Sequence, residues 1–83
     1  STEELDPYLG TYSSKDLPLK ITVSKEGNVL IAQATGQSSF KLKATEKAKF
    51  KFEPAGVVLE FDPADNSMIL KQGGGTFNFV KEK

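Results

Sequence analysis

Two short motifs in the sequence contain residue types that could do chemistry. Ser38-Ser39-Phe40-Lys41 matches an S-x-x-K pattern, in which one turn of a helix brings a nucleophilic serine next to an activating lysine. Here the motif overlaps the start of an alternating apolar segment. Positions three apart on a strand point to opposite faces, so we do not expect Lys41 to activate Ser38. Gly73-Gly74-Gly75-Thr76 could surround a phosphate, but it precedes a strand pattern and not the helix that a phosphate loop needs. We expect a hairpin turn there.

The acidic residues offer a second kind of chemistry, and their positions argue against it. Asp62, Asp65 and Asn66 lack the spacing of a calcium loop. Glu53, Glu60 and Asp62 fall on the polar face or in turns, where water keeps a carboxylate ionised. The chain also has no Cys and no His, which removes the thiol nucleophile, the Ser/His pair and the usual zinc ligands. We therefore expect no catalytic residue, no metal site and no cofactor, and we do not expect the chain to be an enzyme by itself.

Lysines and phenylalanines alternate in the middle of the chain, as they do in some proteins that bind single-stranded nucleic acids. The lysines concerned are Lys41, Lys43, Lys47, Lys49 and Lys51. On a strand this alternation places the rings on the face opposite the charges, whereas a stacking surface needs both on one face. The chain has no Arg and a formal net charge of zero, which disfavours binding to a phosphate backbone. We expect no nucleic-acid partner.

Apolar and polar residues alternate along most of the chain, which is the period of a half-buried strand. After a first strand at Leu9 to Tyr12, the inward-facing sets are Leu19, Ile21 and Val23; Leu30, Ala32 and Ala34; Phe40, Leu42 and Ala44; Ala48, Phe50 and Phe52; Val57, Leu59 and Phe61; Met68 and Leu70; and Phe77 and Phe79. Short turn segments rich in Gly, Pro, Asn and Asp separate them. Such short connections cannot contain crossover helices, so neighbouring strands must pair antiparallel.

These strands predict an all-β fold, an antiparallel up-and-down meander of about eight short strands. About eight strands can close into a barrel whose interior is just filled by side chains, while an open sheet would leave two unpaired edges. We expect one small closed or nearly closed barrel domain at residues 8–83, after a lead-in segment at residues 1–7. In the lead-in, residues 1–5 can form one helical turn that Pro7 ends. No apolar run approaches the roughly 18 residues of a membrane span.

Two aromatic residues near the start are candidates for binding a ligand. Tyr8 and Tyr12 lie four apart, so on a strand they share a face, where they either close one end of the core or line a barrel mouth. Four small inward residues would leave room for a ligand: Ala32, Ala34, Ala44 and Ala48. The six phenylalanines argue against a large cavity, because densely packed rings leave little space.

Three apolar residues on the outward face are candidates for an interface. Val58, Ile69 and Val80 fall on three consecutive predicted strands and should lie near one another if the pairing is sequential. Single apolar residues on a surface are normal. Alternatively they form a docking stripe that is covered by the lead-in around Leu5 or by another domain.

Several segments together resemble one known bacterial module. They are Tyr8-Leu9-Gly10-Thr11-Tyr12, Leu19-Lys20-Ile21-Thr22-Val23, Glu26-Gly27-Asn28, Leu30, Ala32-Gln33-Ala34-Thr35-Gly36-Gln37, Phe40 with Leu42, Phe50, and Leu59-Glu60-Phe61. From Tyr8 to about Val80 the chain resembles the lipocalin-like domain of unknown function that lies C-terminal to β-lactamase-like (penicillin-binding) serine hydrolase domains and in some secreted or lipoprotein chains. The chain does not begin with Met, so we expect a processed product or a piece of a longer protein.

The resemblance implies a lipocalin-like barrel in the bacterial cell envelope, either periplasmic, on the outer surface or secreted. It implies a non-catalytic accessory or interaction domain beside a neighbouring hydrolase domain in the parent chain, and that domain would hold the catalytic residues. The alternative is a stand-alone small β-barrel that binds an apolar or peptide-like ligand.

Overall fold

The computed structural model describes residues 2–15 and 18–82. Within these residues, nine strands form a single sheet, accompanied by two short 3₁₀ helices. In chain order the elements are η1 (Thr2–Tyr8), β1 (Gly10–Ser13), β2 (Lys20–Glu26), β3 (Val29–Ala34), β4 (Phe40–Lys41), β5 (Lys43–Glu46), β6 (Lys49–Phe52), η2 (Glu53–Ala55), β7 (Val57–Asp62), β8 (Ser67–Gln72) and β9 (Gly75–Lys81). No helix in the described part of the chain is long and apolar enough to cross a membrane.

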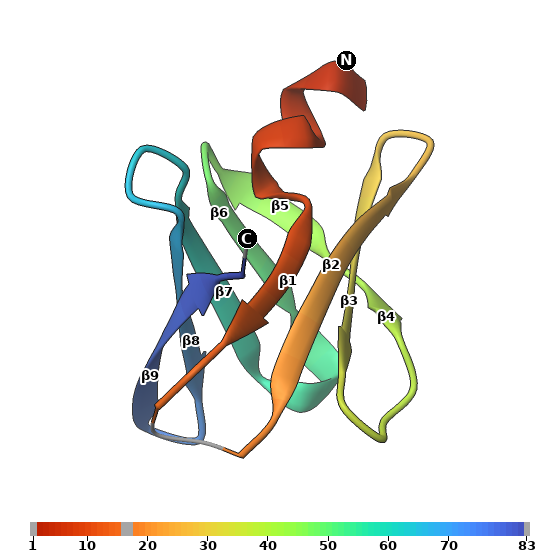
Figure 1. The fold of residues 1–83 in the computed structure, drawn as a ribbon. Coiled ribbons are helices and arrows are strands. Elements are labelled where there is room, and N and C mark those ends of the chain that lie inside the picture. Colours follow the sequence, from red (N-terminus) through yellow and green to blue (C-terminus); the bar gives the residue numbers. More distant parts are fainter. Residues whose placement is uncertain (1, 16–17, 83) are drawn as a thin grey trace.

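The sheet is an antiparallel meander that curls into a nearly closed barrel (Figure 1). The strand order is β4-β3-β2-β1-β9-β8-β7-β6-β5, so the first strand pairs with the last. At that junction Tyr12 lies opposite Lys81, and Ser13 lies opposite Val80. The hairpin turns fall where the sequence predicts them, for example at Gly73, whose φ is 60°. The predicted all-β, up-and-down, nearly closed barrel is therefore confirmed.

One predicted strand is divided between the two ends of the sheet. The alternating segment from Phe40 to Ala44 forms β4, which pairs with β3, and then β5, which pairs with β6. Leu42 joins the two strands, and its backbone N–H donates a hydrogen bond of 2.8 Å to the carbonyl of Leu30. Because strands in a barrel are tilted, this segment crosses from one edge of the sheet to the other. We call the line where β4 and β5 meet the seam. Because this one predicted strand forms both β4 and β5, the sheet has nine strands where the sequence predicts about eight.

The core consists of the inward-facing residues of the strands together with two tyrosines. Its buried members are Tyr8, Tyr12, Ile21, Val23, Leu30, Ala32, Leu42, Phe50, Val57, Leu59, Phe61, Met68, Leu70 and Phe79. The ring of Tyr8 lies between Phe50 and Phe61, at centroid distances of 5.5 Å and 4.9 Å. Two predicted inward residues are not fully buried: Ala44 on β5 pairs with the buried Phe50 but is exposed, and Ala48 packs against the core from the β5–β6 turn, with a φ of 63°. The tight turn requires this left-handed backbone, and alternation alone does not reveal it.

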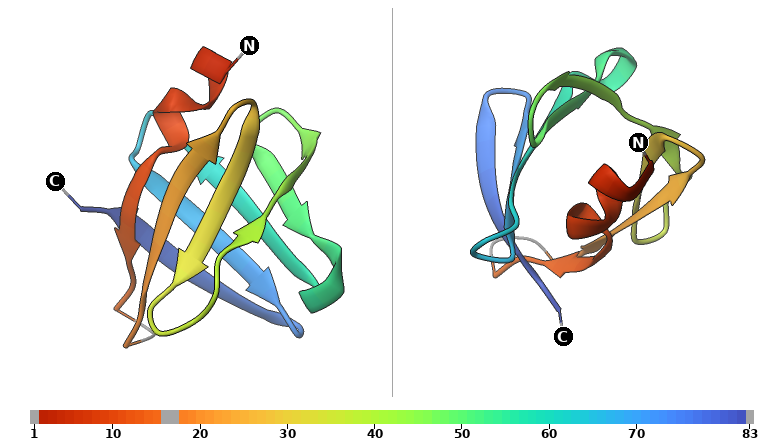
Figure 2. Two further views of the ribbon diagram at one scale, coloured as in Figure 1. Left: turned by 90° about the vertical axis from the view of Figure 1, so that its right-hand side faces the viewer. Right: turned by 90° about the horizontal axis from the view of Figure 1, so that it is seen from above.

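The lead-in forms η1, which lies over one end of the barrel (Figure 2). Contrary to the prediction, the helix does not end before Pro7 but runs through it to Tyr8. Contacts from β1 and β9 explain this. The Tyr12 hydroxyl donates to the Tyr8 carbonyl at 2.9 Å, and Lys81 Nζ donates to the Pro7 carbonyl at 2.8 Å. These bonds and the burial of the Tyr8 ring outweigh the local preference of the residue before a proline. We call this end of the barrel the helix end, and the opposite end the open end.

Candidate binding pocket

The two tyrosines lie together at the helix end, and both are buried. Tyr8 is the last residue of η1, not part of the first strand, and is 8% exposed; Tyr12 on β1 is 2% exposed. The ammonium of Lys81 lies 5.6 Å from the centroid of the Tyr12 ring. Burial raises the pKa of Tyr12 from 10.0 to about 12. Both tyrosines are therefore part of the core at this end, and Tyr8 also lines the groove there.

The open end contains a pocket of about 450 Å³. Its floor is aliphatic and buried, formed by Ile21, Ala32, Val57, Leu59 and Leu70. Its rim carries three half-buried rings and two exposed amides, from Phe40, Phe52, Phe77, Gln37 and Gln72. The described residues that line it include no Lys, Asp or Glu. An apolar molecule can enter this pocket without meeting a charge.

Stacked aromatic rings form one wall of the pocket, at the seam. Phe40 on β4 and Phe52 on β6 have centroids 4.6 Å apart and ring planes within 26° of each other. Here β4 pairs with β3, and β6 pairs with β5 and β7, so the two rings join strands on opposite sides of the seam. Side-chain stacking therefore closes the barrel wall at this point.

The third ring of the rim depends on a glycine. A Cβ added to Gly75 would lie 2.9 Å from Phe77 Cζ, a distance that would force the ring to move. The absence of a side chain at Gly75 thus lets the Phe77 ring approach the backbone. In the sequence the run Gly73-Gly74-Gly75 indicates only a turn.

The expectation that six phenylalanines fill the interior is wrong at this end. Phe40, Phe52 and Phe77 stand at the rim, so the space above the floor remains free. The volume exceeds the roughly 300 Å³ at which pockets for drug-sized molecules begin. The sequence signal for the pocket is the pair Ala32 and Ala34, which do line it.

The helix end carries a wider groove of about 870 Å³, between η1 and the β2–β3 and β5–β6 hairpins. Tyr8, Ala44 and Ala48 line it, together with the charged residues Glu46 and Lys47. The four alanines expected to leave room for a ligand therefore line two different sites, Ala32 and Ala34 at the open end and Ala44 and Ala48 at the helix end. The groove is partly polar and open to solvent.

The three candidate interface residues lie on adjacent strands, as predicted, but in a diagonal line. Val58 on β7 is opposite Lys71, and Ile69 on β8 is opposite Glu60. Val80 on β9 is 57% exposed. The residues directly opposite Val58 and Ile69 on the next strand are therefore polar: Lys71 and Asn78. Leu5 packs against the core at the helix end instead of covering them.

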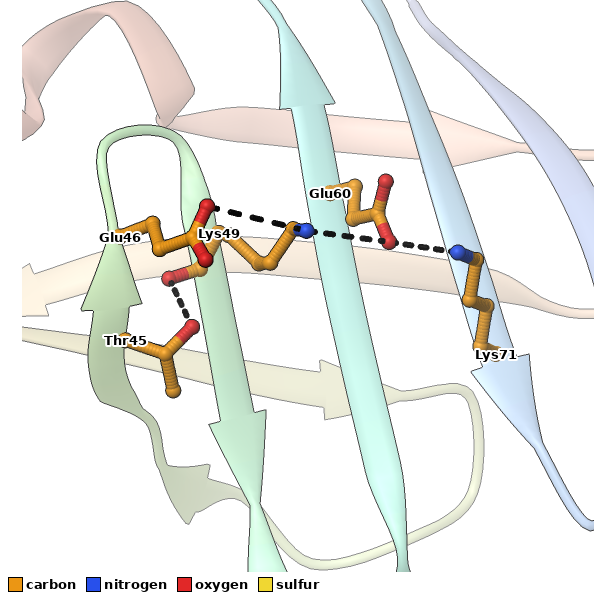
Figure 3. A network of polar contacts seen from close by, with 5 residues as sticks. All are labelled: Thr45, Glu46, Lys49, Glu60 and Lys71. Carbon is orange, nitrogen blue, oxygen red and sulfur yellow. Dashed lines mark hydrogen bonds and ion pairs between the residues drawn. The ribbon is translucent and has the colours of Figure 1, made fainter.

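A chain of ion pairs crosses the same outer face (Figure 3). Glu60 lies 2.7 Å from Lys71 Nζ and 4.0 Å from Lys49 Nζ, and Lys49 also lies 3.9 Å from Glu46. The hydrogen bond from Lys71 holds the pKa of Glu60 below its usual value of 4.5. The Thr45 hydroxyl donates to the Lys49 carbonyl at 3.2 Å. These contacts link β5 to β8 across the surface, and such exposed pairs stabilise a fold only modestly.

The serine and the lysine of the S-x-x-K motif do not line the pocket, although Phe40 between them does. Ser38 is in the exposed loop before β4, and Lys41 is exposed on β4. In the described part of the chain, no group of acidic residues is placed to hold a metal ion. Comparison of the chain with protein-family models, with curated proteins and with solved structures finds no match. The resemblance to the hydrolase-associated domain stays a prediction.

Proposed function

We propose that this domain is a non-catalytic binding module that takes a small, apolar molecule into the pocket at its open end. The observation that carries the proposal is the pocket itself, an aliphatic floor with a volume of about 450 Å³ behind a rim of three phenylalanines. Most small-molecule sites are concave, mainly apolar, and contain a few polar groups.

The difference between the two ends of the barrel supports this proposal. At the helix end the Tyr8 ring packs on Phe50 and Phe61, whereas at the open end the small side chains of Ala32 and Ala34 are part of the pocket lining. The hydrogen-bonded strands hold the pocket floor in place, so little conformational entropy is lost when a ligand binds. Each Å² of apolar surface that a ligand buries contributes about 25 cal/mol.

The test is a titration with the uncharged fluorescent probe N-phenyl-1-naphthylamine. Probe fluorescence should rise on binding to the wild-type protein, and Ala34→Phe, which fills the pocket, should abolish the rise. The matched control is Ala44→Phe, which places the same ring at the helix end and should leave the rise unchanged. Thermal unfolding verifies that both variants fold. If the wild-type protein gives no rise, or if Ala34→Phe binds as well as wild type, the proposal is wrong.

We propose an accessory role beside a neighbouring hydrolase domain of the bacterial envelope as the second candidate. The exposed Val80, with Val58 and Ile69 on adjacent strands, favours it as an apolar contact surface. The test is the intact mass of the native polypeptide, detected in cell-envelope fractions with an antibody against this domain. A mass several times the 9.0 kDa of this chain supports the accessory role, and a mass near 9.0 kDa contradicts it.

A further inference from the structure

We propose that the pocket selects an uncharged amphipathic molecule, an alkyl chain whose outer end carries a hydrogen-bond donor that Gln72 accepts. This inference rests on the proposed function and adds the class of ligand. Three features of the pocket support it: where its polar groups lie, which hydrogen-bonding atoms they leave available, and where the neighbouring charges lie.

Polarity in the pocket increases from the floor to the rim. Ala32 and Leu59 at the floor are completely buried, whereas Gln37 and Gln72 at the rim are exposed. A ligand that matches this gradient has its apolar end inside and its polar end at the rim.

The hydrogen bond of Gln72 fixes the orientation of its amide. Its Nε2 donates to the Ala55 carbonyl of η2 at 3.3 Å. A carbonyl oxygen can only accept, so the atom facing it must be the amide nitrogen, which leaves Oε1 as an acceptor and the second N–H of Nε2 as a donor. A hydroxyl group can pair with either, whereas an ether oxygen or a carboxylate has no donor for Oε1.

The lysines next to two of the rim rings lie on the other face of the sheet. Lys41 and Lys51 are the chain neighbours of Phe40 and Phe52, and adjacent residues on a strand point to opposite faces. Lys51 is also engaged by Glu53, at 3.3 Å. An ionised head group at the rim would lose water without gaining a charged partner from the described lining residues, and an unpaired buried charge is unfavourable.

The test compares three ligands with the same alkyl chain as competitors of N-phenyl-1-naphthylamine, all below their micellar concentrations. They are decanol, decyl methyl ether, which lacks a donor, and decanoate, which is charged. We expect decanol to compete about three- to ten-fold more effectively than the ether, the effect of one hydrogen bond, and decanoate to compete least. Equal competition by all three would overturn the inference and leave the proposed function intact. Competition by none, or no probe binding at all, would contradict the proposed function itself.

A variant tests the role of Gln72 separately. Gln72→Leu should remove the preference for decanol over the ether while both still compete. The control Asn78→Leu removes an exposed amide from the outer face of β9 and should keep the preference. A preference for decanol that persists in Gln72→Leu would overturn the role of Gln72. The ligand comparison in the wild-type protein tests the class of ligand even if Gln72→Leu does not fold.

Discussion

Gly10 shows how one residue fixes η1 to the barrel. Its φ is 140°, a backbone conformation that L-residues with a side chain rarely adopt. A Cβ at this position would lie only 3.2 Å from Cδ of Lys81. Lys81 in turn bonds to the Pro7 carbonyl and lies over the Tyr12 ring. The short segment Tyr8-Leu9-Gly10-Thr11-Tyr12 is therefore a structural unit that holds the helix end closed.

We expect Gly10→Ala to lower the free energy of unfolding by about 1–3 kcal/mol, because backbone strain and the displaced Lys81 both act at this position. Denaturant unfolding measures this loss. The control is Gly36→Ala in the exposed β3–β4 loop, where φ is also positive, at 76°, but a Cβ meets nothing within 4 Å. That change should cost only about 1 kcal/mol. Equal losses in the two variants would contradict the role given to Lys81.

The buried Tyr12 hydroxyl gives the protein a pH dependence in the alkaline range. Burial raises the pKa of Tyr12 from 10.0 in the unfolded chain to about 12 in the native state. The unfolded chain therefore loses this proton first, and the free energy of unfolding should fall as the pH rises from 10 to 12. Below pH 10 this contribution is complete.

Tyr12→Phe tests both the hydrogen bond and its titration. We expect a loss of about 1 kcal/mol at neutral pH, from the bond to the Tyr8 carbonyl, and a weaker decline of stability between pH 10 and 12. Denaturant unfolding at several pH values, with the tyrosinate absorbance followed in parallel, gives both quantities. An unchanged alkaline decline in the variant would mean that another group causes it.

At the scale of the elements, the seam is where the two edge strands of the sheet, β4 and β5, meet without pairing with each other. There the Leu42 N–H donates a hydrogen bond to the Leu30 carbonyl, and the Phe40 ring stacks on the Phe52 ring. We expect Phe40→Ala to cost about 2 kcal/mol, less than the roughly 3–5 kcal/mol of a fully buried ring, because Phe40 is half-buried. The loss of the stack should also speed hydrogen exchange of the Leu42 amide.

The control for the seam is Phe77→Ala, which removes another half-buried ring from the same rim. Phe77 lies on β9, where it pairs with Leu70 of β8, away from β4 and β5. This variant should lose comparable stability while the Leu42 amide exchanges at nearly the wild-type rate under native conditions. If both variants speed that exchange equally, the stack does not hold the seam.

The same elements show what the sequence can predict and what it cannot. Alternation and turn residues are local signals, and they correctly predict the strands, the hairpins and the antiparallel meander. They do not reveal which strand each segment pairs with, so they miss the division of the segment from Phe40 to Ala44 into β4, which pairs with β3, and β5, which pairs with β6. The continuation of η1 through Pro7 is also missed, because it depends on Lys81, 74 residues away in the chain. At the pocket, Ala32 and Ala34 are predictable from their size, whereas the rim position of three phenylalanines follows only from the closure of the barrel.

At the scale of the whole molecule, the pairing of the first strand with the last closes the barrel. Most strands pair with their neighbours in sequence, but β1 pairs with β9 at Tyr12 and Ser13. Bringing such distant segments together costs chain entropy before any contact compensates for it. Hairpins such as β7–β8 and β8–β9 close short loops and carry long registers, so they can form earlier.

This topology predicts an order of folding events, with closure of the barrel last. Folding should take milliseconds to seconds, as in other small proteins with many long-range strand pairs. Met68→Ala on β8, whose side chain is buried between β7 and β9, should slow folding, because its contacts belong to the early hairpins. Lys81→Ala should mainly speed unfolding, because its contacts with Pro7 and Tyr12 form after the transition state. Stopped-flow folding and unfolding rates over a range of denaturant concentrations distinguish the two variants. If Lys81→Ala slows folding in proportion to its loss of stability, β1 and β9 already meet in the transition state, and their pairing is an early event.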